Sequence, residues 1–73
     1  ENLLARKPQG LTPRELEVLQ FTTSGYSNSQ IASALEITLN TVDSYKERIK
    51  GKFGLDSIVE CVAYAVKRGL VSV

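Results

Sequence analysis

Four cations fall between positions 46 and 52 of this chain. Lys46, Arg48, Lys50 and Lys52 are accompanied there by a single acid, Glu47. A local cluster of this kind is suited to contacting the phosphates of a nucleic acid. The surrounding residues add hydroxyl and amide groups, which can hydrogen-bond to the edges of bases. The chemistry that this segment offers is therefore the recognition of DNA.

Catalytic and metal chemistry find little support in the sequence. The chain has no histidine and one cysteine, Cys61, which excludes a disulfide framework and a Cys/His zinc site. It has no Gly-rich phosphate loop and no apparent set of acid, base and nucleophile. We therefore expect no enzymatic activity, no metal and no cofactor. An unpaired cysteine on an apolar helical face is usually a core residue, and a reduced thiol suits the cytoplasm.

The composition is that of one small, soluble globular domain. The 73 residues are 42% hydrophobic and 23% charged, with a net charge of +1. No apolar run approaches the roughly 20 residues that span a membrane, and no signal peptide is visible. The chain does not begin with Met, so we expect a fragment of a longer protein.

Capping patterns predict where the first two helices begin and end. Thr12, Pro13 and Glu15 supply an N-cap, a proline at the first helical position and an acid three residues after the cap. Gly25 is a typical stop for this helix. A second capping box, at residues 27–30, opens a short helix. The residues expected to face inward on it are Ile31, Ala34 and Leu35.

Two further helices follow, and no segment shows the alternation of a strand. Thr38 is the expected N-cap of the third helix, which Gly54 ends, and a third capping box at residues 57–60 opens a fourth helix that stops at Gly69. The predicted fold class is all-α with four helices. Residues 1–10 lack a clear period, and we interpret them as the remnant of an interdomain linker, with the domain at 11–73.

The third helix, about residues 38–53, has two distinct faces. Placing successive residues 100° apart puts Val42, Tyr45, Ile49 and Phe53 on one apolar stripe. The opposite surface carries Asn40, Asp43, Ser44, Glu47, Arg48 and Gly51. Lys46 and Lys50 border this surface on one side and Lys52 on the other. We expect the flanking cations to contact phosphates and the polar centre to face base edges.

Two acids on that face need an explanation, because DNA is itself negative. Asp43 and Glu47 are compatible with DNA binding because a carboxylate can accept a hydrogen bond from cytosine N4. They can also orient Lys46 or Lys50 at i, i+3 spacing. A solvated amphipathic helix with no DNA function is the plainer alternative.

Several spaced segments carry a family resemblance. They are LTPRELEVL (11–19), GYSNSQIA (25–32), LEIT (35–38), TV (41–42) and KFGL (52–55), together with Ala65, Gly69 and Leu70. The chain resembles the DNA-binding domain of LuxR-type (LuxR/FixJ/NarL) bacterial transcription regulators. The resemblance implies a four-helix helix-turn-helix domain, linked to a receiver or sensory domain in a cytoplasmic response regulator. It also implies that the third helix enters the major groove.

The resemblance implies roles for individual residues as well. Base contacts fall on Asp43, Ser44 and Glu47. Phosphate contacts fall on Ser27, Ser29, Thr41, Tyr45, Lys46, Lys50 and Lys52. The chain departs from the usual family pattern at Asp43, where lysine is common, and at Tyr45, where histidine is common. Tyr45 is either a core residue or a buried ring with its hydroxyl on a phosphate, and we favour the second. Arg14 and Glu17 are expected to make ion pairs within the domain and not contacts with DNA, and Glu15 is expected to cap the first helix.

The fourth helix has a wider apolar face than a small core requires. Ile58, Cys61, Val62 and Ala65 form one arc, and Val59, Ala63 and Val66 extend it. The surplus strip predicts a partner surface, with deeper burial or cover by another domain as the alternative. The resemblance favours a homodimer that presents two recognition helices to two half-sites.

The leading function is sequence-specific binding of double-stranded DNA in transcription regulation, with RNA polymerase as a possible further partner and no membrane role. Two alternatives remain open. A sigma-factor promoter-reading domain also has Leu-Thr-x-Arg-Glu before its helix-turn-helix, although the turn at 25–28 and the Gly69–Leu70 ending favour the LuxR type. The second alternative is a helical protein-interaction module, whose cationic face would be solvated and would not contact DNA.

Overall fold

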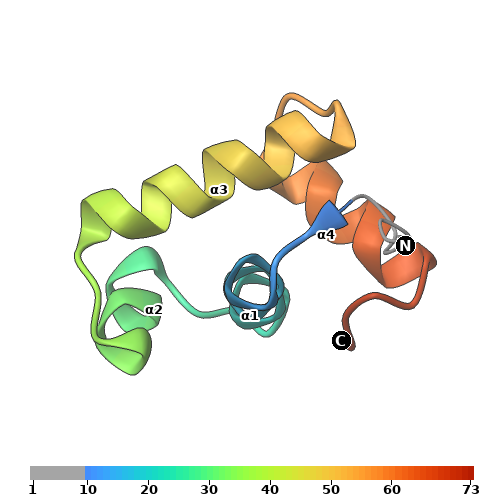
Figure 1. Cartoon of the computed structure of the whole chain (residues 1–73). Coiled ribbons are helices and arrows are strands. Elements are labelled where there is room, and N and C mark those ends of the chain that lie inside the picture. The colour runs from blue at the N-terminus through green and yellow to red at the C-terminus, as the bar shows by residue number, and fades with distance from the viewer. Residues whose placement is uncertain (1–9) are drawn as a thin grey trace.

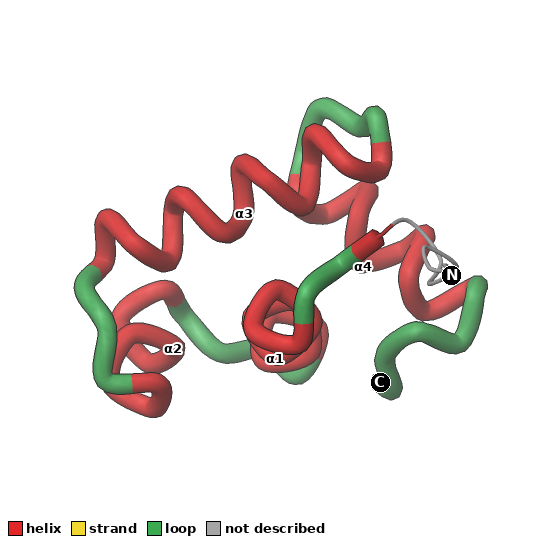
Figure 2. The backbone as a smooth tube through the Cα atoms, viewed as in Figure 1, coloured by secondary structure: helices red, strands yellow, loops and turns green. Residues whose placement is uncertain are grey.

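The computed structural model describes residues 10–73, and this part of the chain consists of helices joined by turns (Figure 1; Figure 2). The helices are α1 (Pro13–Thr23), α2 (Asn28–Leu35), α3 (Leu39–Phe53) and α4 (Ile58–Lys67). The predicted all-α class with four helices is confirmed. Of the segment interpreted as a linker, residues 1–9 lie outside the described part of the chain.

Every one of these helices begins at a hydroxyl side chain. The N-caps are Thr12, Ser27, Thr38 and Ser57, and each side-chain oxygen accepts a hydrogen bond from the backbone N–H three residues later. At α1 and α2 the N3 side chain also bonds back to the N-cap N–H, which completes the capping box. The capping box predicted at the start of α4 is incomplete. The Glu60 N–H donates to Ser57 Oγ at 3.2 Å, but the Glu60 side chain does not bond back to the Ser57 N–H.

The four helices also end in the same type of turn. In each, an N–H donates to the carbonyl five residues earlier: Tyr26 to Phe21, Ile37 to Ala32, Leu55 to Lys50 and Leu70 to Ala65. The residue before each donor has a left-handed φ, which glycine adopts without steric cost. These residues are Gly25, Glu36, Gly54 and Gly69, with φ of 94°, 59°, 71° and 74°. Only Glu36, in the turn that joins α2 to α3, is not a glycine.

α3 runs across the domain above α2 and α1, and α4 packs beneath its C-terminal end (Figure 1). The core lies between them and contains Val18, Leu19, Ile31, Val42, Ile49, Cys61 and Ala65, all fully buried. The predicted apolar stripe of α3 is confirmed, because Tyr45 and Phe53 also pack against this core. Since α1, α2 and α4 all pack on one side of α3, its other side faces away from the domain.

The inward face predicted for α2 was partly wrong. Ile31 is buried and Leu35 half-buried, but Ala34 is exposed and Ala32 is buried instead. At about 100° per residue, Leu35 and Ala32 lie on one side of Ile31, whereas Ala34 lies on the other. The buried arc of this short helix is therefore rotated toward Ala32.

Cys61 has the predicted core position, as a free and fully buried thiol. Burial raises the pKa of the Cys61 thiol above its ordinary value, and the nearby Lys50 opposes this only in part. The neutral form of the side chain is therefore favoured, as expected for a small apolar residue between helices.

The end of the described chain is fastened to α1 by one glutamine. Gln20 Nε2 donates to the Ser72 carbonyl at 2.8 Å, and the Ser72 N–H donates to Gln20 Oε1 at 3.0 Å. The amide thus pairs with both backbone groups of Ser72 and joins the C-terminal tail to α1. Within residues 10–73, no helix is long and apolar enough to cross a membrane.

Candidate nucleic-acid interface

The side of α3 that faces away from the core is continuous and, apart from Leu39 and Gly51, polar. Its exposed residues are Leu39, Asn40, Asp43, Ser44, Glu47, Arg48 and Gly51. The three residues predicted to contact bases therefore share one open face. Because α3 is held from behind by three helices, this face can enter a groove without rearrangement of the domain.

Asp43 and Lys46 are joined through a third residue, Asn28, at the start of α2. Asn28 Nδ2 donates to Asp43 Oδ1 at 3.2 Å, and Lys46 Nζ donates to Asn28 Oδ1. Partial burial lowers the pKa of Lys46, and the charge of Asp43 works against that shift. The predicted base-contacting acid is thus held by a side chain from the neighbouring helix.

Glu47 and Lys50 pair directly. Lys50 Nζ lies 2.7 Å from Glu47 Oε2, at the i, i+3 spacing that the sequence suggested. The hydrogen bond that Lys50 donates to Glu47 raises the pKa of Lys50 above its usual value. The acid therefore orients the lysine along the edge of the open face and also neutralises part of its charge.

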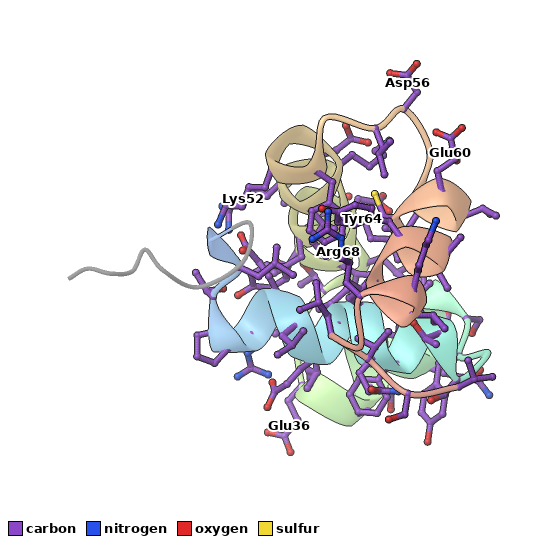
Figure 3. The ribbon with its side chains drawn as sticks, turned by 90° about the vertical axis from the view of Figure 1, so that its right-hand side faces the viewer. Glu36, Lys52, Asp56, Glu60, Tyr64 and Arg68 are labelled. Atoms are coloured by element: carbon purple, nitrogen blue, oxygen red, sulfur yellow. The ribbon has the colours of Figure 1, made fainter. Side chains whose placement is uncertain are left out.

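Lys52 is engaged within the domain. Its ammonium donates to Glu15 Oε1 at 2.7 Å and to the Gly10 carbonyl at 3.0 Å, and Figure 3 shows it beside the start of α1. Burial raises the pKa of Glu15, but hydrogen bonds from Lys52 and Thr12 outweigh this and set the pKa below its ordinary value. The cation predicted to contact a phosphate is therefore directed toward α1.

The hydroxyl groups assigned to phosphates differ in their availability. Ser27 Oγ is occupied as the N-cap of α2, and Thr41 Oγ1 lies 2.9 Å from Thr38 Oγ1. Ser29 is exposed. Tyr45 is half-buried with the Arg48 guanidinium 5.4 Å from its ring centre, an arrangement that suits both of the roles considered for it. These contacts with DNA remain predictions.

Three residues at this interface, Asn28, Leu39 and Arg48, have roles that the sequence pattern did not indicate or indicated weakly. Asn28 was seen only as part of a helix start, and its link to α3 had no local signal. Leu39 is 50% exposed in the first turn of α3, one turn before Asp43. Arg48 is exposed, and its guanidinium lies over the Tyr45 ring instead of forming an ion pair as Lys50 and Lys52 do.

The surplus strip of α4 is a second open surface. Val59 is 73% exposed, Ala63 is exposed and Val66 is half-buried against the core. Glu60 and Lys67 are exposed beside this strip. In Figure 3, Glu60 points away from the helix, and Tyr64 lies next to Arg68, whose guanidinium is 5.0 Å from the ring centre.

Comparison with known proteins agrees with this geometry. The family model described as "Bacterial regulatory proteins, luxR family" matches residues 9–65. The chain belongs to this family. The family is one of DNA-binding transcription regulators with a helix-turn-helix.

Among curated proteins, the oxygen regulatory protein NreC of Staphylococcus aureus is 43% identical over 61 residues, which are 84% of this chain. The chain spans 28% of the length of that relative. Among solved structures, the transcription factor GerE has a TM-score of 0.80 and 27% identity, over 85% of this chain and 92% of GerE. A LuxR-type receptor, the VqmA dimer of Vibrio cholerae, has a TM-score of 0.83 and 33% identity, over 96% of this chain and 33% of VqmA.

In this luxR-family domain, many residues that carry the family pattern have structural roles. Thr12 and Glu15 form the capping box of α1. Arg14 and Glu17, which were predicted to make ion pairs within the domain, pair with each other at 3.5 Å. Of the two residues that differ from the common pattern, Asp43 lies on the open face of α3, where base contacts are expected, whereas Tyr45 packs against the core.

Proposed function

We propose that this luxR-family domain binds double-stranded DNA sequence-specifically in transcription regulation, with α3 in the major groove. The observation that carries the proposal is the continuous polar face of α3, exposed along its length and bordered by cations. A helix held from one side, with the other side free, has the form that the major groove admits. We propose that the domain acts by binding DNA and does not catalyse a reaction.

The proposed base-reading residues are Asp43, Ser44 and Glu47. Leu39 adds an apolar group on the same face, which suits contact with the methyl group of thymine. The proposed phosphate contacts are Ser27, Ser29, Thr41, Tyr45, Lys46 and Lys50, with Arg48 added. Lys52 contributes positive charge nearby, although Glu15 holds its ammonium.

The domain is proposed to bind as a homodimer through Val59, Ala63 and Val66 of α4. The high exposure of Val59 supports this, because covering an exposed apolar strip removes it from water and is therefore favourable. The similar LuxR-type receptor VqmA is described as a dimer. Two copies related by a twofold axis would present two α3 helices to two half-sites.

The domain is proposed to be part of a longer cytoplasmic bacterial response regulator, since it spans 28% of the similar NreC, which is named an oxygen regulatory protein. In such a protein, a receiver or sensory domain linked to this one would control DNA binding. RNA polymerase is a proposed partner at the promoter.

The experiment that tests DNA reading is selection of binding sites from a random duplex library, followed by affinity measurements at several salt concentrations. The selected duplex should bind at least about 1,000-fold more tightly than a shuffled duplex of equal composition. The logarithm of the binding constant should also fall linearly with the logarithm of the salt concentration. Equal binding of the two duplexes contradicts the proposal, and absence of binding to either favours a protein-interaction module.

Matched variants separate the two kinds of contact. Lys50→Ala should weaken binding to all sequences similarly and reduce the salt slope by about one. Ser44→Ala should change which duplex is preferred and leave the slope unchanged. If Lys50→Ala changes the preferred duplex and Ser44→Ala reduces the salt slope, the assignment of Lys50 to a phosphate and Ser44 to a base is wrong.

A further inference from the structure

Two acid–lysine pairs with the same spacing lie one helical turn apart on α3, yet they are arranged differently. Glu47 and Lys50 form a direct ion pair at 2.7 Å. Asp43 and Lys46 have the same i, i+3 spacing, but Asn28 lies between them and bonds to both. The difference between the two pairs is therefore the presence of an amide from α2.

We propose that Asn28 is a positioning residue for base recognition, which keeps Lys46 away from Asp43 and holds the Asp43 carboxylate toward the groove. The inference rests on the proposed function, in which Asp43 contacts a base. It adds a residue of α2 to the determinants of sequence preference.

An asparagine has the chemistry that this place requires. Its amide carries donors on nitrogen and an acceptor on oxygen, so it can bond an anion and a cation at once. Here Nδ2 donates to Asp43 and Oδ1 accepts from Lys46. An aspartate at this position would repel Asp43, and a lysine would repel Lys46.

The position of Asn28 is also well fixed. It is the first residue of α2, directly after the N-cap Ser27, and the complete capping box with Gln30 holds this end of the helix. α2 lies beneath the N-terminal half of α3 (Figure 1). The amide therefore reaches α3 from a separate, rigid element.

The consequence concerns the groups that Asp43 offers to DNA. With Oδ1 bonded to Asn28, Oδ2 is left to accept a hydrogen bond from the amino group of cytosine. A direct pair with Lys46 would put a donor beside that acceptor, and the site would then also tolerate guanine or thymine oxygens. We therefore expect the preference for cytosine at this position to depend on Asn28.

The test selects duplexes from a random library with the wild type, Asn28→Ala, Asp43→Ala and the double variant. The wild type should enrich cytosine at one position, and Asp43→Ala should abolish that enrichment. Asn28→Ala should reduce it about five- to tenfold at the same position and leave the other positions unchanged. In the Asp43→Ala background, removal of Asn28 should have no further effect on this preference.

Two more variants make the result specific. Ser33→Ala, at an exposed position of α2, should retain the wild-type profile. Asn28→Asp keeps an acceptor for Lys46 but repels Asp43, so it should also lose the cytosine preference. This second substitution decides the question if Asn28→Ala does not fold, as judged by circular dichroism.

An unchanged cytosine preference in Asn28→Ala or in Asn28→Asp overturns the positioning role. Additive effects of Asn28→Ala and Asp43→Ala overturn it as well, since they indicate separate contacts with DNA. If Asp43→Ala itself retains the preference, the base contact assigned to Asp43 is wrong, and the positioning role falls with it.

Discussion

Glu15 Oε1 accepts a 2.7 Å hydrogen bond from Lys52 Nζ, which joins the first turn of α1 to the last turn of α3. The same oxygen accepts the Thr12 N–H at 2.9 Å. The Glu15 side chain is 3% exposed and that of Lys52 33%. One carboxylate therefore caps α1 and also fixes the distal end of the proposed reading helix.

The first prediction concerns the pH dependence of stability. The folded protein holds the pKa of Glu15 below its ordinary value. The stabilisation is therefore complete above that ordinary value and is lost as pH falls through the folded pKa. Glu15→Gln keeps an acceptor for Thr12 but loses the charge, and should cost about 1.5 to 3 kcal/mol at neutral pH. Urea unfolding of both proteins should give converging stabilities in acid.

Glu17→Gln is the matched control, because Glu17 forms an exposed pair with Arg14. It should cost less than about 0.5 kcal/mol at any pH. A stability difference between the wild type and Glu15→Gln that does not change with pH contradicts the charged pair.

The second prediction compares two cations of α3. Arg48 has no acidic partner within the described residues, whereas Lys52 is held by Glu15. Arg48→Ala should reduce the slope of log affinity against log salt by about one, and Lys52→Ala by clearly less. Fluorescence anisotropy with one selected duplex at several salt concentrations measures both slopes. Equal reductions would show that Lys52 leaves Glu15 to contact a phosphate.

The third prediction concerns Leu39 and thymine. Replacing single thymines of a selected duplex by deoxyuridine removes only the C5 methyl group. At one position this replacement should weaken DNA binding by the wild-type domain about three- to fivefold. Such a loss corresponds to the roughly 0.8 kcal/mol gained by burying one CH₂-sized group. Leu39→Ala should be insensitive to the replacement. Leu16→Ala, at a 37% exposed position of α1, should remain sensitive, and so controls for loss of an exposed leucine.

The fourth prediction concerns the proposed dimer. Glu60 and Lys67 lie two turns apart beside the same edge of the Val59 strip. In an antiparallel pair of α4 helices, Glu60 of one copy would lie near Lys67 of the other. Glu60→Lys or Lys67→Glu should each weaken binding to a duplex with two half-sites about three- to tenfold, and the combined exchange should restore it.

Binding to a single half-site is the control for the charge exchange, and none of these variants should affect it. A combined variant that binds the paired site no better than the single ones contradicts the antiparallel arrangement. Val59→Asp should then still weaken paired binding if α4 forms the interface in another orientation.

The fifth prediction concerns the turn between α2 and α3. Glu36 adopts φ 59° where the other three helices use glycine, and in Figure 3 its side chain points away from the domain. Glu36→Gly should relieve the left-handed strain and raise the free energy of unfolding by about 0.5 to 1 kcal/mol. Glu36→Ala, which removes the charge but keeps Cβ and so the left-handed strain, should bring no such gain in urea unfolding.

The helix boundaries were predictable because their signals are local. Thr12, Ser27, Thr38 and Ser57 each bond to an N–H only three residues away, so the pattern lies within four residues of sequence. The apolar stripe of α3 was predictable for the same reason, from one helical period. The short α2 gave too few residues to fix its buried arc, and Ala34 was misplaced.

The contacts that shape the interface have no local signal. Glu15 and Lys52 lie 37 residues apart in the chain, and Asn28 reaches Asp43 and Lys46 over 15 and 18 residues. Such pairs depend on the angles and distances at which the helices pack. The pattern of a single sequence does not specify these closely enough to predict a hydrogen bond between two helices. Asp43, Ser44 and Glu47 could therefore be proposed from the sequence, but Leu39 and the partners that orient the α3 side chains could not.

The bond between Gln20 and Ser72 has a consequence for the order of folding. It spans 52 residues, so closing it requires α1 and the C-terminal tail to be in place together. Helices form within microseconds, whereas contacts between distant residues form later. Protection of the Ser72 amide from hydrogen exchange should therefore appear late in refolding and report completion of the whole domain.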